Sequence, residues 1–271
     1  MTVLMTAFIS IKDLSIGQKA GGALFVLLLA FAFLQPLYYP MDASLQNLDG
    51  TLQAASAHHW LGTDHFGRDM LARIASAIRL SLTLIVLSVS VALFFGVLAG
   101  VTSGYFGGWI DAVCSFVCDI IMALPGLLFV LLFAAIAPNS FWSLYLGISL
   151  VLWVEFFRMV RAMTRTIANS GEVECSRLMG MDFLYCFKRH FLPKILPVLA
   201  TLSAFAAANA VLALATLGFV NVGLRPPTAE LGLMMTELFP YYYQAPWVFL
   251  QPIVMVFILV FSLQLLSGKI Q

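Results

Sequence analysis

Apolar residues in this chain are gathered into five long stretches that contain no charged side chain. The stretches cover residues 20–41, 80–110, 120–154, 195–224 and 238–268. A helix needs about 20 consecutive apolar residues to cross the hydrocarbon core of a bilayer. Each stretch is long enough, so the pattern predicts membrane-spanning helices rather than the amphipathic helices of a soluble core.

The third stretch is long enough for more than one helix. Pro138-Asn139-Ser140 lies near its middle and is typical of a turn. We therefore assign the end of one span and the whole of the next to this stretch. Six spans result, at about 20–39, 80–103, 114–136, 141–158, 196–219 and 247–267. A separate amphipathic helix is expected at about 68–79, and the fold class is all-α and polytopic.

The composition agrees with a membrane location. Of the 271 residues, 62% are hydrophobic and 10% are charged, whereas an average soluble protein carries about 25% charged residues. No long basic run indicates a nucleic-acid partner. The four cysteines lack CxxC spacing, so neither a zinc site nor a disulfide framework is indicated. Cys114 and Cys118 lie one turn apart and are expected to pack inside the third span.

Basic residues indicate which side of the membrane the loops face. The loop between spans 4 and 5 carries seven of the chain's 14 basic residues, and such loops lie in the cytoplasm. They are Arg158, Arg161, Arg165, Arg177, Lys188, Arg189 and Lys194. Six spans then place both termini in the cytoplasm, in agreement with Lys12, Lys19 and Lys269. We expect the first span to be uncleaved, because its apolar core is long and no small-residue cleavage site follows it.

The cytoplasmic loop is predicted to fold as two short helices. Asn169, with an acidic residue three positions later, is a capping arrangement for the first helix. Gly180 suits the left-handed conformation that ends a helix. Asp182 can cap a second helix at 183–190, which Pro193 is expected to end.

An apolar ridge framed by charge is predicted on these two helices. It consists of Val173, Leu178, Met179, Phe183, Leu184 and Phe187. One interpretation is a hairpin that lies on lipid headgroups; the interpretation we prefer is a helix presented to a groove on a partner. The chain contains no Gly-x4-Gly-Lys-Ser/Thr phosphate loop. If the protein uses ATP, another subunit must therefore bind it.

The loop between spans 1 and 2 is expected outside the cell. Residues 59–69 mix glycines with Asp64, Arg68 and Asp69, which is typical of a turn held by internal charge pairs. We interpret it as a structural clasp, with contact to a substrate-delivering protein as the alternative. Three of the four histidines also fall here: His58, His59 and His65. Imidazole suits nickel, copper or zinc, but hydrogen bonding within the turn is the preferred interpretation.

Charged and aromatic residues near the membrane are further candidates. Asp111 and Asp119 are expected to pair with basic residues rather than to form a proton or ion site. Glu155 is expected to pair with Arg158. The tyrosines at 241–243, with a nearby tryptophan, are interpreted as an interfacial aromatic belt, and a substrate gate is the alternative.

The cytoplasmic loop resembles a known signature. Glu174-Cys175-Ser176 is followed after three residues by Gly180 and, nine residues later, by His190-Phe191-Leu192-Pro193. This spacing resembles the Glu-Ala-Ala, Gly and Ile-x-Leu-Pro signature of ABC-importer permeases. Cys175 and Ser176 stand where that signature has alanines and are also small. His190 stands where it has isoleucine.

Three more stretches resemble the oligopeptide, dipeptide and nickel branch of these permeases, second-subunit type. The first runs from His59-Trp60 to Arg68-Asp69 and resembles the branch signature His-x-Leu-Gly-Thr-Asp-x-x-Gly-Arg-Asp. The second is Trp153 with Arg158 and Arg161, and the third lies within 217–232. Together the matches extend over about 59–235.

The resemblance implies the type I ABC-importer permease fold, with six transmembrane helices and a cytoplasmic coupling loop, 165–194, between helices 4 and 5. It divides the chain into 1–79, which holds the N-terminal helix, first span and extracytoplasmic loop, and 80–271, the transmembrane core. It implies ATPase coupling by Glu174, Cys175, Ser176, Arg177, Leu178, Gly180, Asp182, Phe183 and Pro193. The extracytoplasmic signature would comprise His59, Gly62, Thr63, Asp64, Gly67, Arg68 and Asp69.

The resemblance also implies a non-catalytic subunit of an ATP-driven importer in the bacterial inner membrane. Its partners would be a homologous second permease, two ATPase subunits that carry ATP and magnesium, an extracytoplasmic binding protein and membrane lipid; this chain itself would bind no cofactor. The sequence around Trp60 is similar to that of nickel-type members of the branch, so nickel or a metal chelate is the expected cargo. Di- or oligopeptides are the alternative.

Two other classes of protein are less favoured. A stand-alone secondary carrier would need charged or broken helices in mid-membrane, and neither is evident in the sequence. A membrane-embedded enzyme would need buried catalytic clusters, but spans 2 to 6 contain no histidine.

Overall fold

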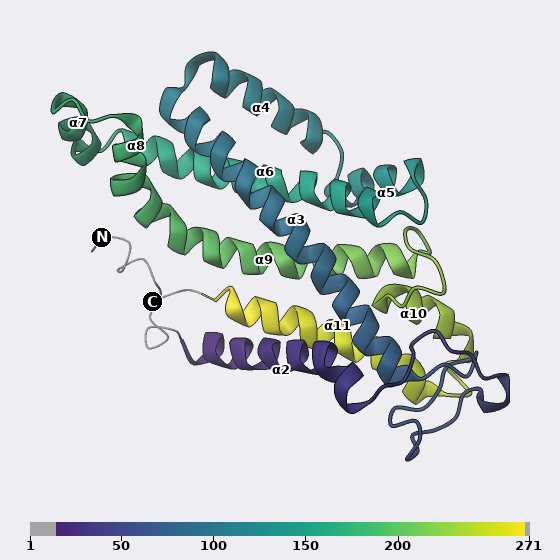
Figure 1. The fold of residues 1–271 in the computed structure, drawn as a ribbon. Coiled ribbons are helices and arrows are strands. Elements are labelled where there is room, and N and C mark those ends of the chain that lie inside the picture. Colours follow the sequence, from purple (N-terminus) through teal and green to yellow (C-terminus); the bar gives the residue numbers. More distant parts are fainter. Residues whose placement is uncertain (1–14, 269–271) are drawn as a thin grey trace.

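The protein is an elongated bundle of helices (Figure 1). The computed structural model describes residues 15–268 and contains no β-strand in that range. Its long helices are α2 (Ile16–Tyr38), α3 (Met70–Phe106), α6 (Phe141–Ala168), α9 (Leu192–Phe219) and α11 (Pro246–Leu266). Five helical stretches are long and apolar enough to cross a membrane, and the number is six if a bent pair of helices counts as one span. The all-α polytopic fold class is therefore confirmed.

Shorter elements gather at the two ends of the bundle. They are η2 (Leu48–Gly50), α7 (Gly171–Leu178), α8 (Phe183–Cys186), η3 (Phe187–Phe191), α10 (Leu231–Leu238) and η4 (Phe239–Tyr241). We call the end that carries α7 and α8 the inner end, and the end that carries α10 the outer end (Figure 1). The start of α2 and the end of α11 meet at the inner end, where Gln18 Nε2 donates to the Gly268 carbonyl over 2.7 Å. Lys12 and Lys269, which supported the expected orientation, lie outside the described residues.

The second span and the amphipathic helix predicted before it form one continuous helix, α3. The sequence predicted a helix at 68–79 and a separate span at 80–103, but α3 is one unbroken helix. No glycine or proline occurs near the expected boundary, and Asp69 caps the start by accepting from the Ala72 N–H over 2.9 Å. The 37 residues give α3 a length of about 55 Å, so it extends beyond a hydrocarbon core of about 30 Å. The expected division at 79 and 80 falls inside α3.

The third span is broken, whereas the sequence predicted one helix at 114–136. The helices α4 (Gly108–Met122) and α5 (Gly126–Ile136) meet at an angle of 79°. Pro125 lies at the break, directly before α5. Its missing N–H and its ring disfavour a continuous helix, and the helix ends just before it.

Glycines bring α3 and α6 into close contact. Gly96, Gly100 and Gly104 recur every fourth residue and so lie on one face of α3. A Cβ atom at Gly100 would lie 2.8 Å from Val160 Cβ, and one at Gly96 would lie 2.5 Å from Phe156 Cβ. Small residues allow this approach, which gives dense packing between membrane helices.

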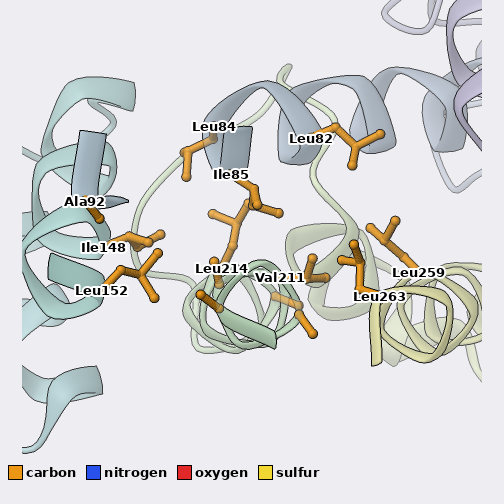
Figure 2. Packing of buried hydrophobic residues seen from close by; sticks show 14 of the residues in the cluster. Leu82, Leu84, Ile85, Ala92, Ile148, Leu152, Val211, Leu214, Leu259 and Leu263 are labelled. Carbon is orange, nitrogen blue, oxygen red and sulfur yellow. The ribbon is translucent and has the colours of Figure 1, made fainter. Parts of the chain in front are cut away.

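The remaining helices pack against this pair. Figure 2 shows Ala92 of α3 facing Ile148 and Leu152 of α6. In the same view Ile85 of α3 points toward Leu214 of α9. All five side chains are buried in one apolar cluster, so α3 contacts both of its neighbours through a continuous core.

A bulkier residue at Gly100 is expected to separate α3 from α6. The Gly100→Val variant should lower the free energy of unfolding by about 1–3 kcal/mol, because the added side chain overlaps Val160. Denaturant unfolding of the purified protein in mixed micelles measures this change. Val86→Leu, at an exposed position of the same helix, is the control, and equal stability of the two variants would contradict the contact.

Candidate functional site

A helical elbow, defined as residues 171–186, projects from the inner end of the bundle (Figure 1). Its first helix, α7, follows Ser170. The predicted cap at Asn169 is wrong, because Asn169 closes the last turn of α6 by donating its N–H to the Arg165 carbonyl over 3.3 Å. Ser170 takes the cap position instead, and its carbonyl accepts from the N–H of Glu174 over 3.1 Å.

The turn between α7 and α8 agrees with the prediction. Gly180 has a φ of +77°, the left-handed conformation that glycine adopts without strain. Asp182 caps α8 by accepting from the Tyr185 N–H over 2.9 Å. These two residues turn the chain back toward the helical bundle.

The second helix of the elbow does not end at Pro193, contrary to the prediction. The helix continues through the π-helical segment η3 into α9, and Pro193 lies in its first turn. In η3 the Leu192 N–H donates to the carbonyl of Phe187, five residues back. A wider turn gives room for the proline ring and does not require its missing N–H, so the elbow joins the fifth span without a break.

Aromatic contacts hold the elbow against the end of α3. The Phe183 ring lies 4.8 Å from the Tyr105 ring and 5.2 Å from the Phe106 ring, centroid to centroid. The Arg177 guanidinium lies over the Tyr105 ring at 4.4 Å, and its Nε donates to the phenol oxygen over 3.2 Å. Val173, on the inward face of α7, is fully buried. The elbow therefore rests on α3.

A polar brace ties α7 to the start of α9. Lys194 Nζ donates to Glu172 Oε2 over 2.8 Å, and this contact lowers the pKa of Glu172. His190 lies between the two helices, with Nε2 2.9 Å from Ser176 Oγ and Nδ1 3.7 Å from Glu172 Oε2. His190 thus has a structural partner on α7 that sequence spacing alone did not reveal.

The outward face of the elbow is apolar and exposed. Leu178 is 83% and Met179 is 67% exposed, and Leu184 is also exposed. The predicted ridge is narrower than expected, because Val173 is buried and Phe187 is half-buried. The other predicted coupling residues divide in the same way: Glu174, Cys175, Arg177, Gly180 and Asp182 are exposed, Phe183 and Pro193 are half-buried, and Ser176 is buried.

A buried cluster of four charged side chains holds the outer end together. Asp64 Oδ2 accepts from Arg68 Nε and lies 3.4 Å from Arg73 Nε. Glu237 Oε2 accepts from Arg68 Nη2 over 3.1 Å and from Arg73 Nη2 over 2.8 Å. The four charges sum to zero, and the cluster joins the 59–69 loop and α3 to α10.

Asp69 forms a second junction in the same loop. Its Oδ2 accepts from the Tyr39 hydroxyl over 2.7 Å and lies 2.9 Å from His59 Nδ1. Burial and the neighbouring carboxylate raise the pKa of Tyr39 to about 12. Gly67 has a φ of +71°, and a Cβ there would lie 1.7 Å from the Asn47 carbonyl oxygen, so only glycine fits. Thr63 Oγ1 accepts from the Gln53 N–H over 2.9 Å.

These contacts agree with the predicted turn held by internal charge pairs, whereas its role as a clasp outside the cell stays a prediction. Gly62, Thr63 and Asp64 are all buried within it. Across residues 15–268, no group of three potential ligand side chains could hold a metal ion. His65 instead stacks on Tyr241 at 5.2 Å, and burial lowers its pKa.

Predicted ion pairs near the inner end agree with the structure in one case only. Asp111 forms salt bridges with Arg161 and Arg165, as expected. Within the described part of the chain Asp119 forms no ion pair, and neither does Glu155.

The partners of the remaining predicted residues lie elsewhere. Arg158 Nη1 approaches Met122 Sδ at 3.1 Å instead of pairing with Glu155. Cys118 is buried beside Val154 and Phe157, so its packing role is confirmed.

Glu230 is a buried carboxylate that the sequence did not single out. Its Oε1 accepts from the Gly232 N–H over 2.9 Å and its Oε2 accepts from the Leu233 N–H over 2.7 Å, so it caps α10. A Cβ at Gly218 would lie 1.9 Å from Oε2, which shows how closely α9 covers this group. Burial raises the pKa of Glu230 to about 7, although its backbone donors act in the opposite direction.

Removal of one partner from the charge cluster is expected to destabilise the outer end. Asp64→Ala should lower the free energy of unfolding by about 3–5 kcal/mol, because Arg68 and Arg73 stay buried with excess positive charge. Denaturant unfolding in mixed micelles measures the loss. The exposed Asp49→Ala variant should change stability by less than about 0.5 kcal/mol, and similar losses in both would refute the role of burial.

The Glu230 carboxyl is expected to make stability depend on pH. Its pKa is higher in the folded chain than the ordinary 4.5, so the folded state favours the protonated form. The contribution of Glu230 to stability should be fully present below pH 4.5 and fall by up to about 3 kcal/mol as the pH rises to 7. Glu230→Gln cannot ionise, so unfolding measured at several pH values should diverge from the wild type in this window. Parallel curves would contradict the assignment.

Comparison with known proteins identifies the family. A sequence model described as binding-protein-dependent transport system inner membrane component matches residues 92–270. A di/tripeptide transport system permease protein, DppC, from Pseudomonas aeruginosa is 32% identical over 258 residues, which is 93% of this chain and 85% of that protein. The dipeptide permease DppC of Haemophilus influenzae is 32% identical over 92% of this chain and 87% of its own length.

A putative peptide permease of Brucella suis is 33% identical over 76% of this chain and 69% of its own length. All three relatives are named as permeases, and none is named for nickel, so the expected nickel cargo is not confirmed. The chain belongs to the binding-protein-dependent inner membrane component family and is a multi-pass, non-catalytic permease subunit of an ABC importer.

Proposed function

We propose that this chain is one transmembrane half of an importer for short peptides, and that ATPase subunits drive it through the elbow. The names of its relatives favour peptides over the nickel that the sequence around Trp60 had favoured. Trp60 packs against Tyr39 with ring centroids 5.0 Å apart. Its difference from typical peptide permeases therefore has a packing explanation that needs no metal.

The observation that carries the proposal is the exposed apolar face of the elbow. Leu178 and Met179 are among the exposed large hydrophobic residues of the chain, yet α7 is too polar to be a membrane span. Solvent-exposed apolar side chains on a rigid short helix are typical of a helix that docks in a groove. Glu174 and Arg177 border this face and supply charge for orientation.

The supports beneath the elbow suit the transmission of movement. Phe183 and Arg177 rest on Tyr105 at the end of α3, and Lys194 ties α7 to α9. A displacement of the elbow would thus act on two spans at once. The lipid-headgroup alternative predicts no such contacts with α3 and α9, because a hairpin that lies on lipid headgroups does not require them.

The proposed assembly contains a homologous second permease, two ATPase subunits and an extracytoplasmic binding protein. ATP and magnesium would bind to the ATPases, because this chain has no phosphate loop. The inner end of the bundle would face the cytoplasm, where the basic residues of the elbow loop favour it. Both termini would then also be cytoplasmic.

A charge on the elbow face is expected to release the ATPases. Leu178→Glu should reduce the ATPase that co-purifies with the tagged chain by about tenfold or more, because an unpaired carboxylate would enter an apolar groove. Dipeptide uptake in cells that lack the native chain should fall in parallel. The matched control is Leu48→Glu, at a position 71% exposed near the outer end.

Several outcomes of this experiment would count against the proposal. Full ATPase recovery with Leu178→Glu would exclude the elbow as the docking site. Release by both variants would indicate a general loss of structure. Uptake of radioactive nickel, but not of dipeptide, by the wild type would restore the metal cargo and exclude peptides.

A further inference from the structure

A polar cleft opens at the outer end, between the turn that follows α9 and the helix α10. Its volume is about 410 Å³, and its lining residues are Asn221, Arg225, Pro226, Leu233, Thr236 and Glu237. Binding sites for small molecules commonly enclose roughly 300–1,000 Å³. The cleft is thus large enough for a small polar ligand, and the clasp described above uses only one of its residues.

Arg225 is the free cation of this cleft. It is exposed and forms no ion pair within residues 15–268. The other arginines near this end are engaged: Arg68 and Arg73 are buried in the neutral cluster, and Arg79 donates to the Ala32 carbonyl. The unbalanced charge of the cleft is therefore positive.

The backbone that carries Arg225 is held in place. Its N–H donates to Asn139 Oδ1 over 2.9 Å, and the Asn139 N–H donates to the Gly223 carbonyl over 3.1 Å. Asn139 belongs to the turn between α5 and α6, so two separate turns fix each other. A guanidinium on a fixed backbone loses less entropy when it binds a ligand.

Glu237 gives the cleft a second charged wall. Its Oε2 accepts from both Arg68 and Arg73, whereas Oε1 has no hydrogen-bond partner among the described residues. The side chain is 11% exposed, so it is held firmly at the edge of the cleft. Because Arg68 and Arg73 balance its charge, Glu237 offers the cleft a hydrogen-bond acceptor, Oε1, rather than net negative charge.

We propose that this cleft is a subsite for the transported peptide, with Arg225 as the partner of its C-terminal carboxylate; this rests on the proposed function. Guanidinium and carboxylate match in a planar, two-hydrogen-bond geometry. A short peptide at neutral pH carries one carboxylate, which corresponds to the free guanidinium of Arg225. Its ammonium group can donate a hydrogen bond to Glu237 Oε1. The cleft thus selects for a free C-terminus.

The test compares two ligands and two proteins. The permease–ATPase complex is purified without its binding protein, and the dissociation constants of Ala-Ala and of its C-terminal amide are measured by calorimetry. Arg225→Gln should weaken Ala-Ala binding by about tenfold. The amide should bind the wild type as weakly as Ala-Ala binds the variant, and Arg225→Gln should weaken it no further.

Two controls separate recognition from general effects. Arg225→Lys keeps the charge without the planar fork and should give an intermediate affinity. Leu45→Glu, at a position 69% exposed in the loop after α2, changes the charge of the outer end by the same amount and should leave both affinities unchanged.

Unchanged Ala-Ala binding by Arg225→Gln would overturn the subsite. Equal weakening of Ala-Ala and the amide would overturn it too, because Arg225 would then act on the fold or on lipid headgroups rather than on the carboxylate. Dipeptide uptake by wild-type cells is scored separately. Normal uptake with no effect of Arg225→Gln refutes the subsite alone, whereas absent uptake refutes the proposed function and the subsite with it.

Discussion

Three glycines on one face of α3 let its backbone approach α6, and the position of both ends of the molecule depends on this contact. α3 extends about 55 Å and is far longer than the bilayer requires. Its outer end carries Arg73 into the charge cluster, and its inner end places Tyr105 beneath the elbow. Because α3 is fixed against α6 along its inner third by Gly96, Gly100 and Gly104, both sites share one rigid support.

Much of this architecture follows from local sequence. Charge-free stretches predict the spans because apolar length is what a bilayer demands. Gly180 and Asp182 predict the elbow turn because their effects are local: Gly180 adopts a positive φ, and Asp182 caps the helix that follows it. The failures concern continuity between elements: α3 passes through an expected boundary, and Pro193 lies inside a helix that it was expected to end. In the first case no glycine or proline interrupts the helix at that boundary, and in the second a π-helical turn directly before Pro193 makes room for its ring.

The contacts within the sites were harder to predict from the sequence than the membrane spans. Glu237 lies 164 positions from Arg73, so no local pattern could reveal their pairing. His190 looked like a departure from a signature, yet its contact with Ser176 shows that a polar residue fits there. The nickel prediction came from Trp60, whose contact with Tyr39 is ordinary aromatic packing. A signature records spacing, whereas the role of each side chain depends on what lies across the fold.

The π-helical turn at Phe187–Phe191 controls how the elbow is oriented relative to α9. A π turn is equivalent to one extra residue inserted in an α-helix, and one residue corresponds to a rotation of about 100° about the helix axis. The segment therefore sets the angular phase between the elbow and α9. Removal of a single residue there would turn the outward face of α8 about the axis while leaving the contacts of α9 with the other spans in place. Orientation of the elbow and packing of the span are thus separable properties of one continuous helix.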